Sequence, residues 1–247
     1  MLHRRGHRHT LPDGATGILE RGAAMWNSLA AGERSRLATR SAEFLDRTEF
    51  EAAGGAAVDD TTRVIIAAHA ARLVLDLGIA AYRDVHSVIV YPSTVVHRGV
   101  RGITPGTSVC SSAAMPILGE AMLHGPVVLA WDAVARDASN PEGGRNVVYH
   151  EFAHKLDMLT GAADGVPPLG SRSAELEWKT MIDAVVVSLR EAEWPDPVLG
   201  AYAETNAAEC FAVATEAFFS IPQQLMTRHR ALHDALAGFY RGEAATS

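Results

Sequence analysis

The pattern that most constrains this chain is the pentapeptide H-E-F-A-H at residues 150–154, which lies in a segment with helical spacing of apolar residues. In an α-helix, His150 and His154 project from the same face, one turn apart, so their imidazoles can reach one point in space. Two imidazole nitrogens bind a zinc ion at about 2.0–2.1 Å each. Glu151 then lies beside a water on that ion, in the position of a general base. The pattern therefore predicts a helix that presents a metal site.

Two histidines are too few for a catalytic zinc site, which has three protein ligands and an open position for water. A third histidine on the same segment, in the arrangement H-E-x-x-H-x-x-G-x-x-H, is excluded. Asp157 and Thr160 occupy the positions of its glycine and last histidine, and the next histidine is His229. The remaining candidates are downstream carboxylates, which are Glu175, Glu177, Glu204, Glu209 and Glu216.

Glu209 is the favoured third ligand. It lies in an apolar helical stretch, A-A-E-C-F-A-V at residues 207–213, where a carboxylate is costly to bury unless it is paired or bound to a metal. Tyr202 precedes it by seven residues, so that its phenol could approach the same site. The alternatives, on the same helical argument or in a more polar stretch, are Glu216, and then Glu175 or Glu177.

The segments around the motif predict an α+β fold, in which a half with a small sheet precedes a helical half. Asn146 is a plausible N-cap for the helix that carries the motif. Periodicity predicts helices over 20–50, 64–82, 174–192, 206–220 and 222–240, and strands over 85–96 and 127–131. Glycine and proline predict loops over 52–57, 97–112 and 161–170.

Composition favours one folded unit. The chain has 247 residues, of which 48% are hydrophobic, so it can bury a sizeable core. Residues 1–19 begin with a basic, histidine-rich stretch and are expected to form a flexible tail, and residues 20–247 are expected to form a single domain.

Charge and cysteine content exclude several classes of protein. The net charge is −7 and no dense basic stripe occurs, which argues against direct nucleic-acid binding. The longest apolar segment, residues 64–82, is interrupted by His69, Arg72 and Asp76, so a membrane span is not expected. The two isolated cysteines suit a reducing compartment. We therefore expect a soluble, cytoplasmic protein.

The stretch N-V-V-Y-H-E-F-A-H-K-L-D-M at residues 146–158 resembles the central motif of one known family, the Mlc titration factor A family of cytoplasmic bacterial zinc peptidases. The second motif is matched by A-Y-A at 201–203 and A-E-C-F-A-V at 208–213. The strand ahead of the motif helix is matched by G-P-V-V-L-A-W at 125–131, and a weaker resemblance extends from about residue 20 to 241.

The resemblance implies a zincin-like metallopeptidase fold and one Zn²⁺ per chain. It implies that His150, His154 and Glu209 are the zinc ligands, that Glu151 is the general base and that Tyr202 is a catalytic helper. The metal core of the family is also similar to that of anthrax lethal factor. From the residues alone, Tyr202 is more simply a half-buried aromatic at the start of a helix, and the resemblance reverses that preference.

The expected activity is zinc-dependent, aminopeptidase-like hydrolysis of a peptide substrate through a water that Glu151 deprotonates. We also expect the strand at 127–131 to pair with an extended peptide, and the loop at 161–170 to shape the cleft. The alternative is a regulatory protein that binds a transcriptional repressor of the Mlc type, as the resemblance implies, with a secondary metal site. Hydrolysis of a substrate other than a peptide is a third, weaker interpretation.

Overall fold

The structure is a computed structural model, and it describes residues 9–93, 95–96, 116–117, 119–121 and 125–242. The first eight residues of the predicted basic tail lie outside the described residues. The same holds for most of the predicted loop at 97–112, which includes Cys110.

A small sheet forms one part of the core, with the strand order β1-β2-β6-β5. Strands β1 (Glu49–Ala52), β2 (Ser87–Tyr91) and β6 (Val127–Ala130) are parallel, and β5 (Gly119–Ala121) is antiparallel to β6. Two further short strands, β3 (Val95–Val96) and β4 (Pro116–Ile117), pair separately. The middle strands β2 and β6 are rich in valine, isoleucine and leucine, and every residue in them is buried or half-buried.

Most of the described chain is helical. The helices are α1 (Ala15–Gly22), α2 (Ala24–Ser28), α3 (Ala31–Arg47), α4 (Asp60–Leu73), α5 (Trp131–Ser139), α6 (Val147–Asp157), α7 (Arg172–Glu191), α8 (Ala207–Ser220), α9 (Pro222–Arg228) and α10 (Arg230–Tyr240). Single 3₁₀ turns are η1 (Ile79–Tyr82), η2 (Pro141–Gly143), η3 (Met158–Thr160) and η4 (Ala201–Glu204).

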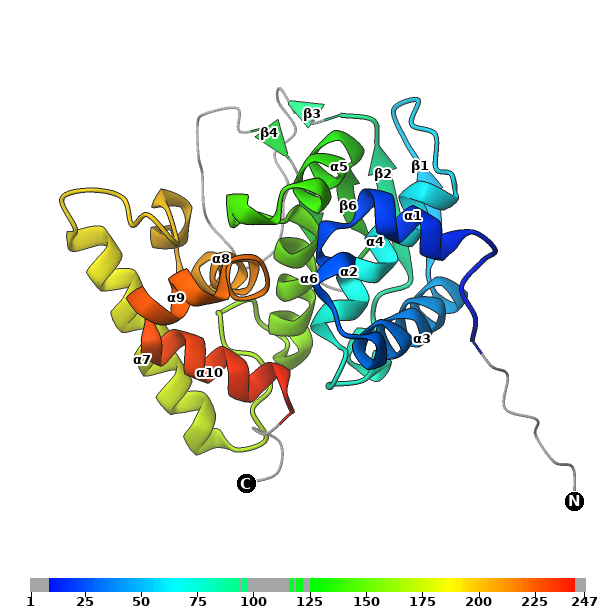
Figure 1. The fold of residues 1–247 in the computed structure, drawn as a ribbon. Helices are drawn as coiled ribbons and strands as arrows, with labels where there is room; N and C mark the ends of the chain where they lie inside the picture. Colours follow the sequence, from blue (N-terminus) through cyan, green and yellow to red (C-terminus); the bar gives the residue numbers. More distant parts are fainter. Residues whose placement is uncertain (1–8, 94, 97–115, 118, 122–124, 243–247) are drawn as a thin grey trace, which may run out of the picture.

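Helix α6, which carries the motif, lies in the middle of the molecule (Figure 1). The sheet and α1–α4 lie to one side of it, and α7–α10 lie to the other. Phe152 on α6 is fully buried, and its ring centroid lies 5.5 Å from that of Phe44 and 5.1 Å from that of Tyr82. One continuous apolar cluster joins residues of β2, β6, α4, α6, α8 and α10. The motif helix is therefore held from both sides by dense packing.

The predicted order, with the strands ahead of the helical half, is confirmed, and the mostly helical fold with its small sheet is compatible with α+β. The helix expected over 20–50 is instead divided into parts of α1, α2 and α3, followed by β1. Strand β1 was not predicted because it is short and mostly exposed, so pairing with β2 rather than local pattern creates it. Packed structure begins before residue 20, since α1 buries Ala15 and Leu19.

Three other predictions differ from the structure. The strand expected over 127–131 ends at Ala130 and α5 begins at Trp131, and the last helix is divided in two at His229. Strand β6 is paired on both sides, with β2 and with β5, so its backbone groups already have strand partners. The prediction that this strand pairs with a peptide by strand addition is therefore wrong.

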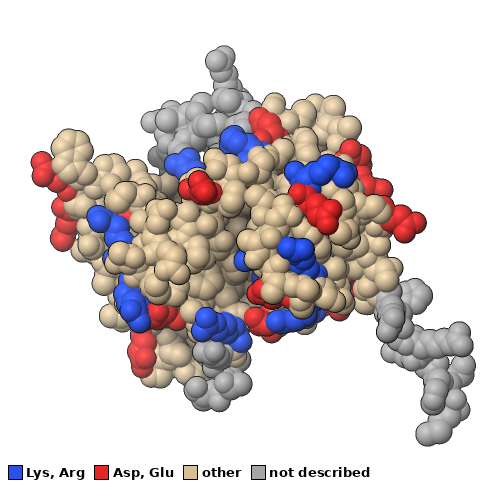
Figure 2. Space-filling view, in the orientation of Figure 1, with Lys and Arg blue, Asp and Glu red and all other residues tan. Residues whose placement is uncertain are grey.

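Basic and acidic side chains are interspersed on the face shown in Figure 2, with no field of a single sign. Among the helices of the described part of the chain, none combines the length and the hydropathy that crossing a bilayer requires.

Candidate metal centre

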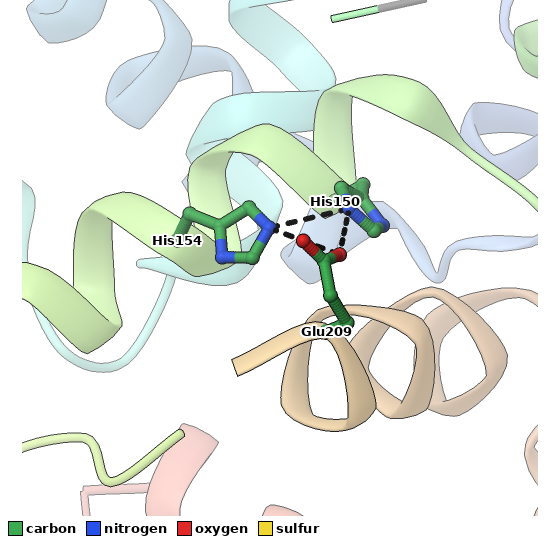
Figure 3. Close-up of side chains that lie close together, drawn as sticks. All are labelled: His150, His154 and Glu209. Atoms are coloured by element: carbon green, nitrogen blue, oxygen red, sulfur yellow. Dashed lines mark hydrogen bonds and ion pairs between the residues drawn. The ribbon is translucent and has the colours of Figure 1, made fainter. Parts of the chain in front are cut away.

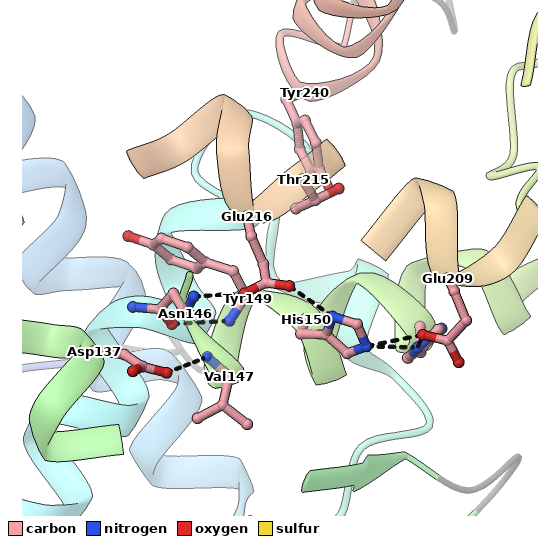
Figure 4. A network of polar contacts seen from close by, with 10 residues as sticks. Asp137, Asn146, Val147, Tyr149, His150, Glu209, Thr215, Glu216 and Tyr240 are labelled. Atoms are coloured by element: carbon pink, nitrogen blue, oxygen red, sulfur yellow. Dashed lines mark hydrogen bonds and ion pairs between the residues drawn. The ribbon is translucent and has the colours of Figure 1, made fainter. Parts of the chain in front are cut away.

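The start of α6 is fixed by three side-chain oxygens that accept backbone N–H groups. The Asn146 side chain accepts from the N–H of Tyr149 at 3.1 Å, which confirms the predicted N-cap. Asp137 accepts from the N–H of Val147 at 3.1 Å, and Glu216 from the N–H of Asn146 at 2.6 Å. These contacts satisfy N–H groups that have no partner within the helix, and the two carboxylates complement its positive end (Figure 4).

Three side chains that the sequence singled out converge on one point (Figure 3). His150 Nε2 lies 3.2 Å from His154 Nε2 and 3.1 Å from Glu209 Oε2, and the last two atoms lie 3.5 Å apart. Ligands about 2.0–2.1 Å from a tetrahedral zinc ion are separated from one another by about 3.3 Å. The triangle of donor atoms therefore has the size that such an ion requires.

Two helices supply this triangle. The histidines come from α6 and Glu209 from the first turn of α8, and the two helices pack against each other. The three side chains are only 12–19% exposed. Burial raises the pKa of Glu209, but hydrogen bonds from His150 and His154 outweigh it, so this pKa lies well below its usual value. Glu209 is therefore a carboxylate, which is the form that binds a cation.

The His150 ring lies between two carboxylates (Figure 4). Its Nε2 faces Glu209, and its Nδ1 donates to Glu216 Oε1 at 2.7 Å. Burial lowers the pKa of His150, but the hydrogen bonds to Glu209 and Glu216 raise it well above its usual value overall. Glu216, the alternative third ligand, thus contacts the nitrogen that points away from the donor triangle.

Glu151 lies next to the triangle and is only 5% exposed. Burial raises its pKa to about 7, partly opposed by His150 and His154 and supported by Glu209 and Glu216. A carboxyl group with such a pKa can both accept and release a proton near neutral pH, which is what a general base requires.

Tyr202 lies on the solvent side of the same site. Its side chain is 43% exposed, and its ring centroid lies 5.8 Å from that of His150. Burial, and then the carboxylates of Glu209 and Glu151, raise the pKa of its hydroxyl. The hydroxyl therefore keeps its proton and can donate a hydrogen bond.

The remaining candidate ligands lie elsewhere. Glu177 accepts a hydrogen bond from Ser173 on the outer face of α7, and neither it nor Glu175 belongs to the donor group. Cys210, next to Glu209, is buried and free, and burial raises the pKa of its thiol to about 12. It is therefore an inert part of the core.

The predicted loop at 161–170 connects the motif helix and η3 to α7, and it passes close to the start of α8, the helix of Glu209. Gly165 donates its N–H to Asp157 Oδ2 at 2.9 Å, and its carbonyl accepts from Trp178 Nε1 at 2.7 Å. The other carboxylate oxygen of Asp157, Oδ1, has no hydrogen-bond partner among the described residues. A side chain on Gly165 would meet the backbone of Ala207, the first residue of α8, because a Cβ there would lie 2.4 Å from the Ala207 carbonyl oxygen. Gly165 thus sets the spacing between the end of α6 and the start of α8.

Sequence reasoning missed the contacts of Asp137 and Glu216 with the start of α6. The available signal was the spacing of Glu209 and Glu216, which are seven residues apart and so lie on one helix face. Nothing in the pattern indicated which of them reaches which nitrogen of His150.

Comparisons with known proteins agree with this geometry. The family model of the glucose-regulated metallo-peptidase M90 matches residues 2–241. An uncharacterized protein of Synechocystis is 34% identical over 235 residues, which cover 93% of this chain and 84% of that protein.

Several relatives carry the name Mlc titration factor A, and two of them illustrate the similarity. The protein of Edwardsiella ictaluri is 36% identical, over 68% of this chain and 64% of its own length. That of Yersinia pestis is 31% identical, over 85% of this chain and 77% of its own length. The resemblance noted in the sequence is thereby confirmed, and the chain belongs to the glucose-regulated metallo-peptidase M90 family.

Proposed function

We propose that this chain is a zinc-dependent, aminopeptidase-like peptidase with one Zn²⁺ held by His150, His154 and Glu209. The observation that carries the proposal is the triangle of donor atoms, whose sides of 3.1–3.5 Å match the ligand spacing of a tetrahedral zinc ion. The donor set of two imidazoles and one carboxylate leaves a fourth position for water or substrate, as in catalytic zinc sites.

Zinc, when bound, supplies a Lewis acid that acidifies water and polarises a carbonyl group. The buried Glu151 accepts a proton from the attacking water and delivers it to the leaving amine, for which a pKa of about 7 is well placed. Tyr202 donates its hydroxyl proton in a hydrogen bond to the carbonyl oxygen as negative charge develops there. In this proposal, Glu151 and Tyr202 serve the chemistry, and the three ligands serve the metal.

The test combines metal analysis with hydrolysis of aminoacyl-anilides. We expect about one zinc per chain and activity that a chelator abolishes. Glu151→Gln should keep zinc and lose turnover, Glu209→Gln should lose both, and Glu175→Gln on α7 should retain both as a matched control. Full activity of Glu151→Gln would refute the mechanism, and full zinc content of Glu209→Gln would refute the ligand set.

A regulatory role is the second candidate function, and the name Mlc titration factor A of the relatives favours it. In this case the chain binds a transcriptional repressor of the Mlc type, and the metal site is secondary. Binding of a purified repressor of this type should then survive Glu151→Gln. If repressor binding and peptide hydrolysis were instead lost in the same variants, both properties would depend on the metal site.

We also propose a zincin-like arrangement, a single folded domain and a cytoplasmic location. The packing of α6 between a small sheet and a helical half supports the zincin-like arrangement, and the continuous apolar cluster supports the single domain. The free, buried thiol of Cys210 supports a reducing compartment.

A further inference from the structure

Glu216 makes two buried contacts that belong to different parts of the molecule. One oxygen accepts the Nδ1 proton of His150 at 2.7 Å, and the other accepts the backbone N–H of Asn146 at 2.6 Å. The side chain is only 10% exposed. The carboxylate thus ties a candidate metal ligand to the backbone at the start of the same helix (Figure 4).

We propose that Glu216 is a positioning residue, which holds the ring of His150 in one orientation with its proton on Nδ1 and so directs the Nε2 lone pair at the metal position. This inference rests on the proposed function only for the identity of the metal. The contact itself is a property of the protein. An imidazole that binds a metal through one nitrogen is commonly oriented by an acceptor at the other.

The geometry favours this role over simple capping of the helix. Capping requires only an acceptor for a backbone N–H, and Asp137 already provides one at the next residue, Val147. The oxygen of Glu216 that faces His150 contributes nothing to the helix end. A carboxylate acceptor at 2.7 Å makes the stronger, charge-assisted kind of hydrogen bond, which suits the orientation of a ring.

The placement of Glu216 also couples two helices to one ring. Glu209 and Glu216 are seven residues apart on α8, which corresponds to about 10 Å along the helix axis. They contact opposite nitrogens of His150 on α6. Sliding of α8 along α6 would therefore disturb the candidate ligand and the positioning contact together, so one register sets both.

The experiment compares Glu216→Ala with Asp137→Ala. Each variant removes a buried carboxylate that accepts a backbone N–H at the start of α6, but only Glu216 contacts an imidazole. Zinc affinity is measured by competition with a chelator. We expect affinity to fall about 10–100-fold in Glu216→Ala and to remain unchanged in Asp137→Ala. Equal losses in both variants, or no loss in Glu216→Ala, would overturn the inference.

A second measurement needs no substitution. Long-range ¹H–¹⁵N spectra of the wild-type protein locate the proton on the His150 ring, and a proton on Nδ1 is expected whether the ring is neutral or charged. A bare Nδ1 would overturn the inference even if the variants fail to fold. Glu216→Gln keeps the shape of the side chain, but its amide has a single carbonyl oxygen and can accept only one of the hydrogen bonds from His150 Nδ1 and the Asn146 N–H. Its zinc affinity should lie between that of the wild-type protein and that of Glu216→Ala.

The outcomes separate this inference from the proposed function. If the wild-type protein binds no zinc, the proposed function fails, while the position of the ring proton still tests the contact. If zinc binds normally but peptides are not cleaved, the peptidase proposal fails, and the affinity ratio of Glu216→Ala to Asp137→Ala still tests the positioning role.

Discussion

Replacing Gly165 by alanine is expected to damage the metal site from a distance. Gly165 has a left-handed backbone with φ of +77°, and its neighbours are the carboxylate of Asp157, the indole of Trp178 and the backbone of Ala207. Ala207 begins the helix that carries Glu209 two residues later. A side chain at residue 165 would therefore press on the element that supplies the carboxylate of the donor triangle.

Two physical effects set the magnitude. Left-handed backbone at a non-glycine residue costs about 1–2 kcal/mol. The new Cβ would lie 2.4 Å from the Ala207 carbonyl oxygen, whereas real Cβ contacts are essentially never below 3.0 Å, so the two segments must separate by about 0.6 Å. Overpacking of this kind costs about 1–3 kcal/mol. We therefore expect Gly165→Ala to lower the free energy of unfolding by about 2–5 kcal/mol in total.

The displacement should also reach the site. Since a misplacement of about 1 Å at a reacting centre can cost about 10²-fold in rate, we expect kcat/KM and zinc affinity to fall by about 10-fold or more. Gly161→Ala is the matched control, because Gly161 lies in the same loop with φ of +95° but has nothing within 4 Å of the new Cβ. It should show the backbone cost alone and keep its zinc affinity.

The assay combines urea denaturation with chelator competition on both variants and the wild-type protein. We expect a larger loss of stability in Gly165→Ala than in Gly161→Ala, and a loss of zinc affinity in the former alone. If the two variants were equally stable and bound zinc equally well, the close approach of Gly165 to Ala207 would have no role in placing Glu209.

Three further perturbations test other parts of the structure. Burial lowers the pKa of His69 from 6.5 to about 4, so the unfolded chain takes up a proton between these values and the folded chain does not. The free energy of unfolding should therefore fall by about 2 kcal/mol from pH 8 to pH 5 through this residue. His69→Leu should make the free energy of unfolding depend less steeply on pH over this range, and a substitution of the exposed His86 serves as the control. Asn146→Ala removes the N-cap of α6 and should cost about 0.5–2 kcal/mol, measured as a lower Tm. Tyr202→Phe should lower kcat by about 10²–10³-fold with unchanged zinc content, and a retained kcat would exclude Tyr202 from the chemistry.

Long, strongly patterned segments of this fold were predictable from the sequence. The motif helix, its N-cap at Asn146 and the helix of Glu209 follow from apolar spacing and local hydrogen-bonding chemistry. Strand β1 and helix α5 did not follow. Both are short, and pairing with β2 or packing on the sheet stabilises them more than their own pattern does.

The pentapeptide itself placed two imidazoles on one face, since helix geometry fixes the relation of residues four apart. The apolar setting of Glu209 indicated that its carboxylate is paired or bound to a metal, because an unpaired buried charge is costly, and Glu216 was the alternative ligand on the same argument. Which carboxylate faces Nε2 and which faces Nδ1 depends on how α8 crosses α6, and that register is set by packing between residues distant in the chain. Helical periodicity puts Glu209 and Glu216 on one face, and the apolar setting of Glu209 together with Tyr202 favours Glu209 as the ligand. Periodicity carries no information about the register of α8 against α6, and so only the folded molecule shows that Glu216 contacts the other nitrogen of His150.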